Sequence, residues 1–238
     1  MLSSHTLEAL KEFLNEQQQN HLEEKETSSS SSEVALVAED WRLSQFWYDQ
    51  HTAETIVREI QLLCADDTSS CSVACIACPT LYAYLKLKFL GVSKDINTYN
   101  TRLVVPGQKI DPSISVSLLE YDKRFEQYGS DFTFYDYNQP EELSQELKHA
   151  YRVIIADPPY LSKECLEKVA QTMKFLIQPG DSHLLLLTGG VQTERAAELL
   201  SLYPCGFKPQ HSSKLGNEFL LFTNYDPGER LGGWELNN

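Results

Sequence analysis

The stretch Arg152-Val153-Ile154-Ile155-Ala156-Asp157-Pro158-Pro159-Tyr160 places a short apolar run directly before a carboxylate, two prolines and an aromatic ring. A continuous apolar run with β-branched residues is typical of a strand buried on both faces of a parallel sheet. Each proline fixes its own φ and keeps the preceding residue extended, so the chain should leave the strand in a rigid conformation. The stretch therefore predicts an α/β protein with a preorganised carboxylate at the end of a strand.

Further apolar runs alternate with helical or loop segments, which is the pattern of a sheet covered by helices on both faces. The predicted strands are residues 72–77, 114–119, 132–135, 152–156 and 183–188. The predicted helices are residues 52–63, 80–89, 141–149, 163–177 and 193–202. A terminal strand pair is predicted at residues 206–211 and 217–225, joined by the polar turn 212–216. We therefore expect a mostly parallel seven-stranded sheet with a C-terminal antiparallel strand pair.

Two segments fall outside this alternating pattern. Residues 1–33 combine a short amphipathic repeat with a Gln-, Glu- and Ser-rich run, so we expect a short helix followed by a disordered linker. The catalytic domain is then expected to span residues 34–238. Within it, residues 91–113 are polar and aperiodic, and a loop of that length is usually functional or disordered. A disordered loop insertion is the favoured interpretation.

Charge and hydropathy narrow the class of partner. The chain of 238 residues carries 34 acidic and 20 basic residues, for a formal charge of -14. Such a field repels the phosphates that dominate nucleic-acid affinity and favours a basic protein partner, although acidity alone also maintains solubility. Apolar runs are far shorter than the roughly 20 residues that cross a bilayer, and the N-terminus lacks a secretory pattern. We expect a cytoplasmic monomer that binds neither membrane nor nucleic acid.

Cys71, Cys75 and Cys78 lie close enough together to raise the question of a metal site. In a strand, positions three apart point to opposite faces, so Cys75 and Cys78 should not converge. No histidine lies nearby to complete four ligands. We therefore expect no metal and predict reduced, mostly buried thiols.

Residues just after the predicted strands are the candidates for chemistry, since ligands of open α/β sheets bind beyond the carboxyl ends of the strands. The Asp157 carboxylate and the Pro158 carbonyl can each accept an N–H, so together they can hold an amino group, with the Tyr160 ring beside it. The alternative is that the two prolines form an ordinary rigid turn. We favour an amine-binding site.

An apolar strand followed by Asp157-Pro158-Pro159-Tyr160 resembles a motif of the amino-methyltransferases, which methylate adenine, cytosine, glutamine or lysine nitrogens. Residues 45–48, 119–125, 134–138 and 217–219 extend the likeness to a narrower family. These are the lysine methyltransferases of elongation factor 1-alpha, once classed as adenine-specific DNA methyltransferases. The similarity covers nearly the whole chain apart from the Ser-rich linker and the loop 91–113. It implies a Rossmann-like methyltransferase fold that uses S-adenosylmethionine.

The resemblance also implies which residues bind the cofactor. Cys78-Pro79-Thr80 would lie at its methionine end, Glu120 at the ribose hydroxyls and Asp136 at the adenine amine. A carboxylate is an acceptor-only group suited to a diol, although both acids are also consistent with solvated loop positions. Many such enzymes have a glycine-rich turn after the first strand, whereas this chain has Ala77-Cys78-Pro79-Thr80. The missing glycines put close backbone approach to the cofactor in doubt.

Trp41, Phe46 and Trp47 either close over the cofactor or target amine, or pack in the core. The resulting hypothesis is methyl transfer from S-adenosylmethionine to a lysine of elongation factor 1-alpha, with Asp157 and Pro158 orienting the nitrogen. Adenine methylation in DNA or RNA is the rival, since the same tetrapeptide serves there. A third interpretation is a binding module on a degenerate methyltransferase fold.

Overall fold

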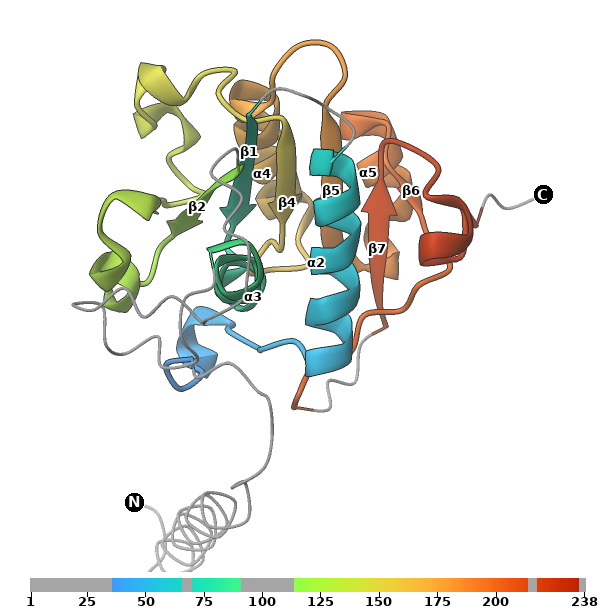
Figure 1. The fold of residues 1–238 in the computed structure, drawn as a ribbon, viewed down its shortest axis with the longest axis horizontal. Helices are drawn as coiled ribbons and strands as arrows, with labels where there is room; N and C mark the ends of the chain where they lie inside the picture. Colours follow the sequence, from blue (N-terminus) through green and yellow to red (C-terminus); the bar gives the residue numbers. More distant parts are fainter. Residues whose placement is uncertain (1–35, 66–69, 91–113, 214–217, 236–238) are drawn as a thin grey trace, which may run out of the picture. The chain divides into compact units, whose positions relative to one another are not determined.

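The computed structural model describes residues 36–65, 70–90, 114–213 and 218–235. Its centre is a seven-stranded sheet in the order β3-β2-β1-β4-β5-β7-β6 (Figure 1). The strands are β1 (Cys71–Ile76), β2 (Ile114–Glu120), β3 (Phe132–Phe134), β4 (Val153–Ala156), β5 (His183–Gly189), β6 (Tyr203–Pro204) and β7 (Phe219–Thr223). β1 to β5 pair in parallel, and β7 runs antiparallel to both β5 and β6. The predicted sheet is therefore confirmed.

Helices cover both faces of the sheet because its strands are apolar on both sides. The helices are α2 (Gln50–Ala65), α3 (Pro79–Leu90), α4 (Lys163–Leu176) and α5 (Thr193–Leu200). One core cluster joins α2 and α3 to alternate strand residues such as Val73 and Ile155. The second joins α4 and α5 to the intervening residues, such as Ala74 and Ile154. In Figure 1, α2 and α3 lie in front of the sheet and α4 lies behind it.

The register aligns the carboxyl ends of the three central strands. Ile76 pairs with Leu119 of β2 and with Ala156 of β4. The hydrogen-bond ladder between β4 and β1 extends one residue beyond β4, because the Asp157 N–H donates to the Ile76 carbonyl over 3.0 Å. The strand order changes direction at β1 and β4, which is where open α/β sheets form their ligand crevice.

The predicted helix at residues 141–149 is wrong. The structure has two short 3-10 turns there, η3 (Pro140–Glu142) and η4 (Gln145–Leu147). Between them Ser144 is extended, with ψ 138°, and its hydroxyl accepts from the Glu146 N–H. A serine that bonds locally to the backbone competes with the helical ladder, which explains the break.

The first strand of the predicted terminal pair is also wrong. β6 is the two-residue strand Tyr203–Pro204, and the ladder ends soon afterwards. Gly206 lies so close to Gly232 that a Cβ on Gly206 would come within 2.8 Å of the Gly232 carbonyl oxygen. The chain from 206 onward bonds instead to the C-terminal turn, through Phe207 N–H and the Leu231 carbonyl, and then to the N-terminal segment. The second predicted strand, 217–225, contains β7.

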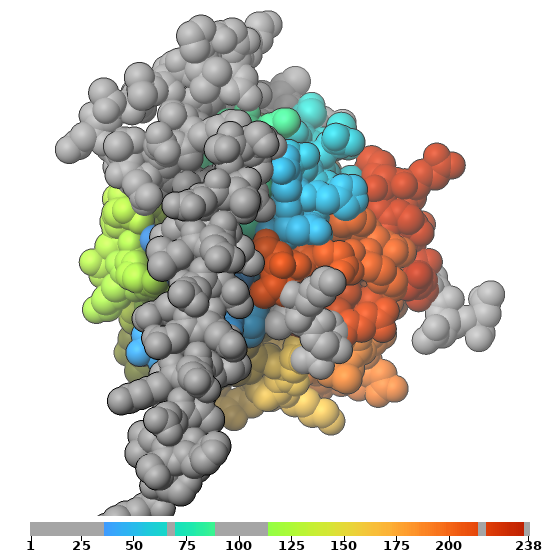
Figure 2. All heavy atoms as spheres, turned by 90° about the horizontal axis from the view of Figure 1, so that it is seen from below, coloured from blue at the N-terminus to red at the C-terminus, as the bar shows by residue number. Residues whose placement is uncertain are grey.

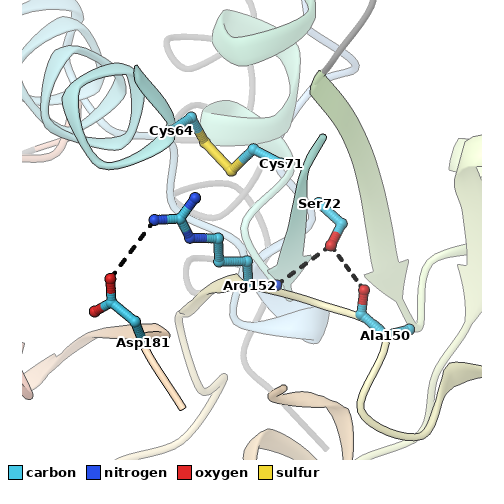
Figure 3. Close-up of a disulfide and its surroundings, with 6 residues drawn as sticks. All are labelled: Cys64, Cys71, Ser72, Ala150, Arg152 and Asp181. Atoms are coloured by element: carbon cyan, nitrogen blue, oxygen red, sulfur yellow. Dashed lines mark hydrogen bonds and ion pairs between the residues drawn. A yellow bond between two sulfur atoms is a disulfide. The ribbon is translucent and has the colours of Figure 1, made fainter. Parts of the chain in front are cut away.

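The cysteines differ from the prediction in two respects. Cys64 and Cys71 form a disulfide between the end of α2 and the start of β1, so reduced thiols are wrong for this pair (Figure 3). Cys75 and Cys78 lie in the same core cluster, because the chain turns at Ala77 and brings Cys78 back to the face of Cys75. Burial, followed by a hydrogen bond with Cys75, raises the pKa of the Cys78 thiol well above its usual value.

Two predictions lie outside the described residues: the helix and linker of residues 1–33, and the loop insertion 91–113. The domain boundary at residue 34 stays a prediction. Among the described residues, no helix is both long and apolar enough to cross a membrane. Over the same ranges, no group of three or more His, Cys, Asp or Glu side chains is placed to hold a metal ion.

Candidate active site

A cavity of about 490 Å³ lies at the carboxyl ends of β1, β2 and β4. Figure 2 views the molecule from this side, with blue, green and orange parts of the chain reaching the same face. The N-terminal segment 43–48 forms one wall of the cavity. All but one of the predicted site residues line the cavity, namely Phe46, Trp47, Cys78, Pro79, Thr80, Glu120, Asp136, Asp157, Pro158, Pro159 and Tyr160.

Trp41 lies outside this set. Its side chain is 64% exposed, and its indole N–H donates to Glu39. The sequence left open whether Trp47 lines the ligand site or packs in the core, and the structure shows both. Trp47 lines the cavity, and its ring also packs edge-to-face on buried Phe125, with 6.4 Å between the ring centroids.

Asp157 follows β4 and is fixed at two points. Its backbone N–H bonds to β1, and its Oδ2 accepts a 2.7 Å hydrogen bond from the Tyr48 hydroxyl. Burial raises the pKa of Asp157 to about 8, against the hydrogen bond from Tyr48, which lowers it, and with a further rise from the charge of Glu120. The free protein therefore holds this carboxyl largely protonated near pH 7.

The loop after Asp157 is held against the sheet. Gln192 donates to the Leu161 carbonyl over 2.6 Å, and Ser162 caps α4 by accepting from the Cys165 N–H. Gly189 at the end of β5 permits this approach, because a Cβ there would come within 3.1 Å of Leu161. Tyr160 is 44% exposed at the mouth of the cavity.

Glu120 and Asp136 occupy neighbouring strand ends. Tyr135 N–H donates to the Glu120 carbonyl, which carries the chain beside β2 up to Asp136. The Glu120 side chain is buried, and its Oε1 accepts from the backbone N–H groups of Tyr121 and Asp122. Burial raises the pKa of Glu120 to about 7. A buried acceptor in a cavity wall fits recognition of a ligand hydroxyl.

The turn after β1 replaces the expected glycine with Ala77. Its φ of +53° lies in the left-handed region, which costs an alanine roughly 1 kcal/mol. The tight turn therefore forms without glycine. The buried Cys78 thiol is directed to the Ile155 carbonyl, 3.6 Å away.

The sequence did not single out Tyr48, Gln45, His211 or Phe219, all of which line the cavity. Gln45, Tyr48 and Phe219 lie within stretches that carried the family resemblance, so the sequence did offer a signal for these three residues. Gln45 bonds to the buried Asp122 over 2.9 Å and accepts from Arg124, which ties the N-terminal wall to β2. His211 gave no signal, because only the fold brings it to Tyr48.

The change of strand order at β1 and β4, with acids at the ends of β2 and β3 bordering one cavity, forms the ligand crevice of an open α/β sheet. This arrangement agrees with the class that the sequence resemblance implies, an S-adenosylmethionine-dependent methyltransferase. The cavity volume is in the range of small-molecule sites, about 300 to 1,000 Å³.

Comparison with known proteins gives the family. Residues 39–227 match the family described as Probable N6-adenine methyltransferase, and the chain belongs to it. It is similar to EEF1A lysine methyltransferase 1 of Gallus gallus, with 38% identity over 95% of this chain and 94% of that one. The Mus musculus protein of the same name is 39% identical over 95% and 92% of the two chains. Protein-lysine N-methyltransferase M142.8 of Caenorhabditis elegans is 35% identical over 94% and 93%.

Proposed function

We propose that this protein transfers a methyl group from S-adenosylmethionine to the ε-amine of a lysine in elongation factor 1-alpha. The observation that carries the proposal is Asp157, held by Tyr48 and facing the cavity that Glu120 and Asp136 also border. The names of the relatives supply the substrate: those from chicken and mouse are called EEF1A lysine methyltransferase 1.

The cofactor would be held by groups from three strand ends. Glu120 would accept from the ribose hydroxyls and Asp136 from the adenine amine, while the turn from Ala77 to Thr80 would lie along the methionine part. When bound, S-adenosylmethionine supplies an electrophilic methyl group on a sulfonium sulfur.

Asp157 and Pro158 would bind and orient the nitrogen. The Asp157 carboxylate accepts one N–H and the Pro158 carbonyl accepts another, which fixes the amine for attack without a covalent intermediate. Tyr160 packs at the mouth of the cavity. Lysine has an ordinary pKa of about 10.4, so its ammonium must lose a proton before reaction. That proton leaves to solvent water. Asp157 orients the neutral amine as an ionised hydrogen-bond acceptor, so activity should rise as pH approaches 8.

A basic protein substrate agrees with the formal charge of -14. Opposite charge accelerates association, and salt weakens the effect beyond a Debye length of about 8 Å at physiological ionic strength. Activity at low substrate concentration should therefore fall as salt rises. We propose that the enzyme acts as a cytoplasmic monomer and leaves nucleic acid unmodified.

The test offers purified elongation factor 1-alpha, DNA and RNA separately to the full chain with labelled cofactor. Mass spectrometry then locates the methyl group. Methyl-lysine in the protein supports the proposal. Methyladenine in a polynucleotide, with the protein unlabelled, would replace it with the adenine methyltransferase alternative.

A further inference from the structure

Four rings gather on the cavity wall beside Asp157. His211 stacks on Tyr48 with ring centroids 4.5 Å apart and an interplanar angle of 28°. The Phe219 and Phe46 rings each meet the imidazole edge-to-face, with ring centroids 4.8 Å and 6.4 Å from it. All four residues line the cavity. We call them the ring wall.

The ring wall is built from parts of the chain that are distant in sequence. Tyr48 and His211 form an isolated antiparallel bridge, and flanking bonds join Ser212 N–H to the Trp47 carbonyl and Asp49 N–H to the Gln210 carbonyl. Phe219 begins β7 and pairs with Gly189, at the carboxyl end of β5. The backbone therefore fixes His211 from both neighbours, and the imidazole is held in place before any ligand arrives.

The position of the ring wall relative to Asp157 indicates its ligand. Tyr48 belongs to the wall and also donates to Asp157 Oδ2, so the rings border the carboxylate that would orient the amine. Aromatic faces attract an ammonium within about 6 Å of the ring centroid and pack against methylene groups. A lysine side chain presents both parts in series.

We propose that Phe46, Tyr48, His211 and Phe219 form the channel that receives the substrate lysine side chain and delivers its amine to Asp157. This inference rests on the proposed function. It identifies the ring wall as the part of the site that selects a long alkylammonium side chain.

His211 suits this task because it stays uncharged. Burial lowers its pKa to about 4, although the nearby charge of Asp49 acts in the opposite direction. A protonated imidazole would repel an incoming ammonium, whereas the neutral ring adds an aromatic face. The neutral His211 ring, stacked on Tyr48, therefore lines the channel without adding a positive charge beside the substrate ammonium.

The experiment compares three changes at one position in the full chain. His211→Phe keeps an uncharged ring, His211→Ala removes the ring, and His211→Lys introduces a charge. We expect His211→Phe to keep KM for elongation factor 1-alpha within about threefold. His211→Ala should raise that KM about tenfold and His211→Lys still further, while the Kd for S-adenosylmethionine stays unchanged in calorimetry.

Tyr203→Ala is the matched control. It also removes a ring that packs on another ring, Trp234, but Tyr203 pairs with Thr223 at the far end of β7 from Phe219. Its KM should equal that of the wild type. A wild-type measurement guards against variants that fail to fold. Butylammonium, which has the four methylene or methyl carbons and the ammonium group of a lysine side chain, should shift the His211 imidazole resonances in NMR and compete with the protein substrate.

The outcomes separate the two proposals. If the wild type methylates elongation factor 1-alpha but KM is unchanged in His211→Ala and His211→Lys, the channel is wrong and the proposed function stands. The same conclusion follows if saturating butylammonium does not shift the imidazole resonances of the wild type. If the wild type leaves the protein unlabelled, both proposals are wrong. A graded rise in KM with unchanged cofactor affinity supports the channel.

Discussion

The Tyr48 hydroxyl donates a 2.7 Å hydrogen bond to Oδ2 of Asp157, across 109 positions of the sequence. Tyr48 is buried and enters the site from the segment before α2, whereas Asp157 leaves β4. The bond favours the ionised carboxylate and so opposes the burial that raises the pKa of Asp157 to about 8. Tyr48 is therefore a positioning residue that also sets the protonation of Asp157.

Tyr48→Phe should move the acidic limb of the pH–rate profile to higher pH. Without the hydroxyl, burial acts on Asp157 unopposed and its pKa rises further above about 8. A hydrogen bond to a charged group is worth roughly 1.5 to 3 kcal/mol, so kcat near pH 7 should fall about tenfold or more. The stack on His211 remains. The control is Tyr82→Phe, which removes a hydroxyl bound to Asp131 outside the cavity. An unshifted limb in Tyr48→Phe contradicts the assigned role.

Asp157→Asn should remove turnover and spare cofactor binding. The amide keeps the size of the carboxylate but cannot take the negative charge that accepts from the amine. Loss of positioning costs several kcal/mol of barrier, so we expect kcat to fall by roughly a thousandfold or more. Calorimetry should give a nearly unchanged Kd for S-adenosylmethionine. Near-normal methylation by the folded variant would refute the role of Asp157.

The stability of the cofactor-free protein should fall as pH rises from about 4 to about 8. The pKa of Asp157 is about 8 in the folded chain, against a reference value of 3.8. The folded state therefore holds a proton that the unfolded state has lost, and the free energy of unfolding decreases with pH across this window. The slope is at most about 1.4 kcal/mol per pH unit for one group. Denaturant titrations of Asp157→Asn should show a flatter dependence; an identical slope would disprove the raised pKa.

Glu120→Gln and Asp136→Asn should each weaken S-adenosylmethionine binding by about tenfold or more. The measurement is made at pH 8, above the pKa of about 7 that burial gives Glu120. Each change then replaces a carboxylate at a strand end with a neutral amide, and charged hydrogen bonds are worth roughly 1.5 to 3 kcal/mol. Glu126→Gln is the matched control, since Glu126 is an exposed acid in η2 (Lys123–Asp131) and does not line the cavity. If both site variants bind like the control, the cofactor assignments are wrong.

Replacing Cys64 and Cys71 together by serine should lower the free energy of unfolding and leave cofactor binding intact. The disulfide closes a short loop, with a sequence separation of 7, for which chain entropy gives about 2.5 kcal/mol. The disulfide is attached at the amino end of β1, whereas the cavity lies at the carboxyl ends of the strands. The hydrogen bond from the Ser72 hydroxyl to the Ala150 carbonyl lies beside it (Figure 3). Urea denaturation with and without reductant tests this. Equal stability under both conditions would exclude a structural disulfide.

Much of the sheet could be predicted from local patterns. The apolar run at 153–156 has four buried residues and no polar side chain, which is typical of a strand at the centre of a parallel sheet. The two prolines limited the conformation after Asp157 in the same local way. The predicted helix at residues 141–149 was wrong because the Ser144 hydroxyl bonds to the backbone at the start of η4 and interrupts a continuous helical ladder.

The sequence by itself determined the five parallel strands, β7, the family resemblance and the acids after β2 and β3, because these depend on periodicity and on motifs contiguous in the chain. Tertiary structure alone decided which side chains meet. Tyr48 reaches Asp157, and His211 stacks on Tyr48, only because the chain after β6 returns to the N-terminal segment. The raised pKa of Asp157 could not be predicted from the sequence either, because burial raises it and burial depends on the packed fold.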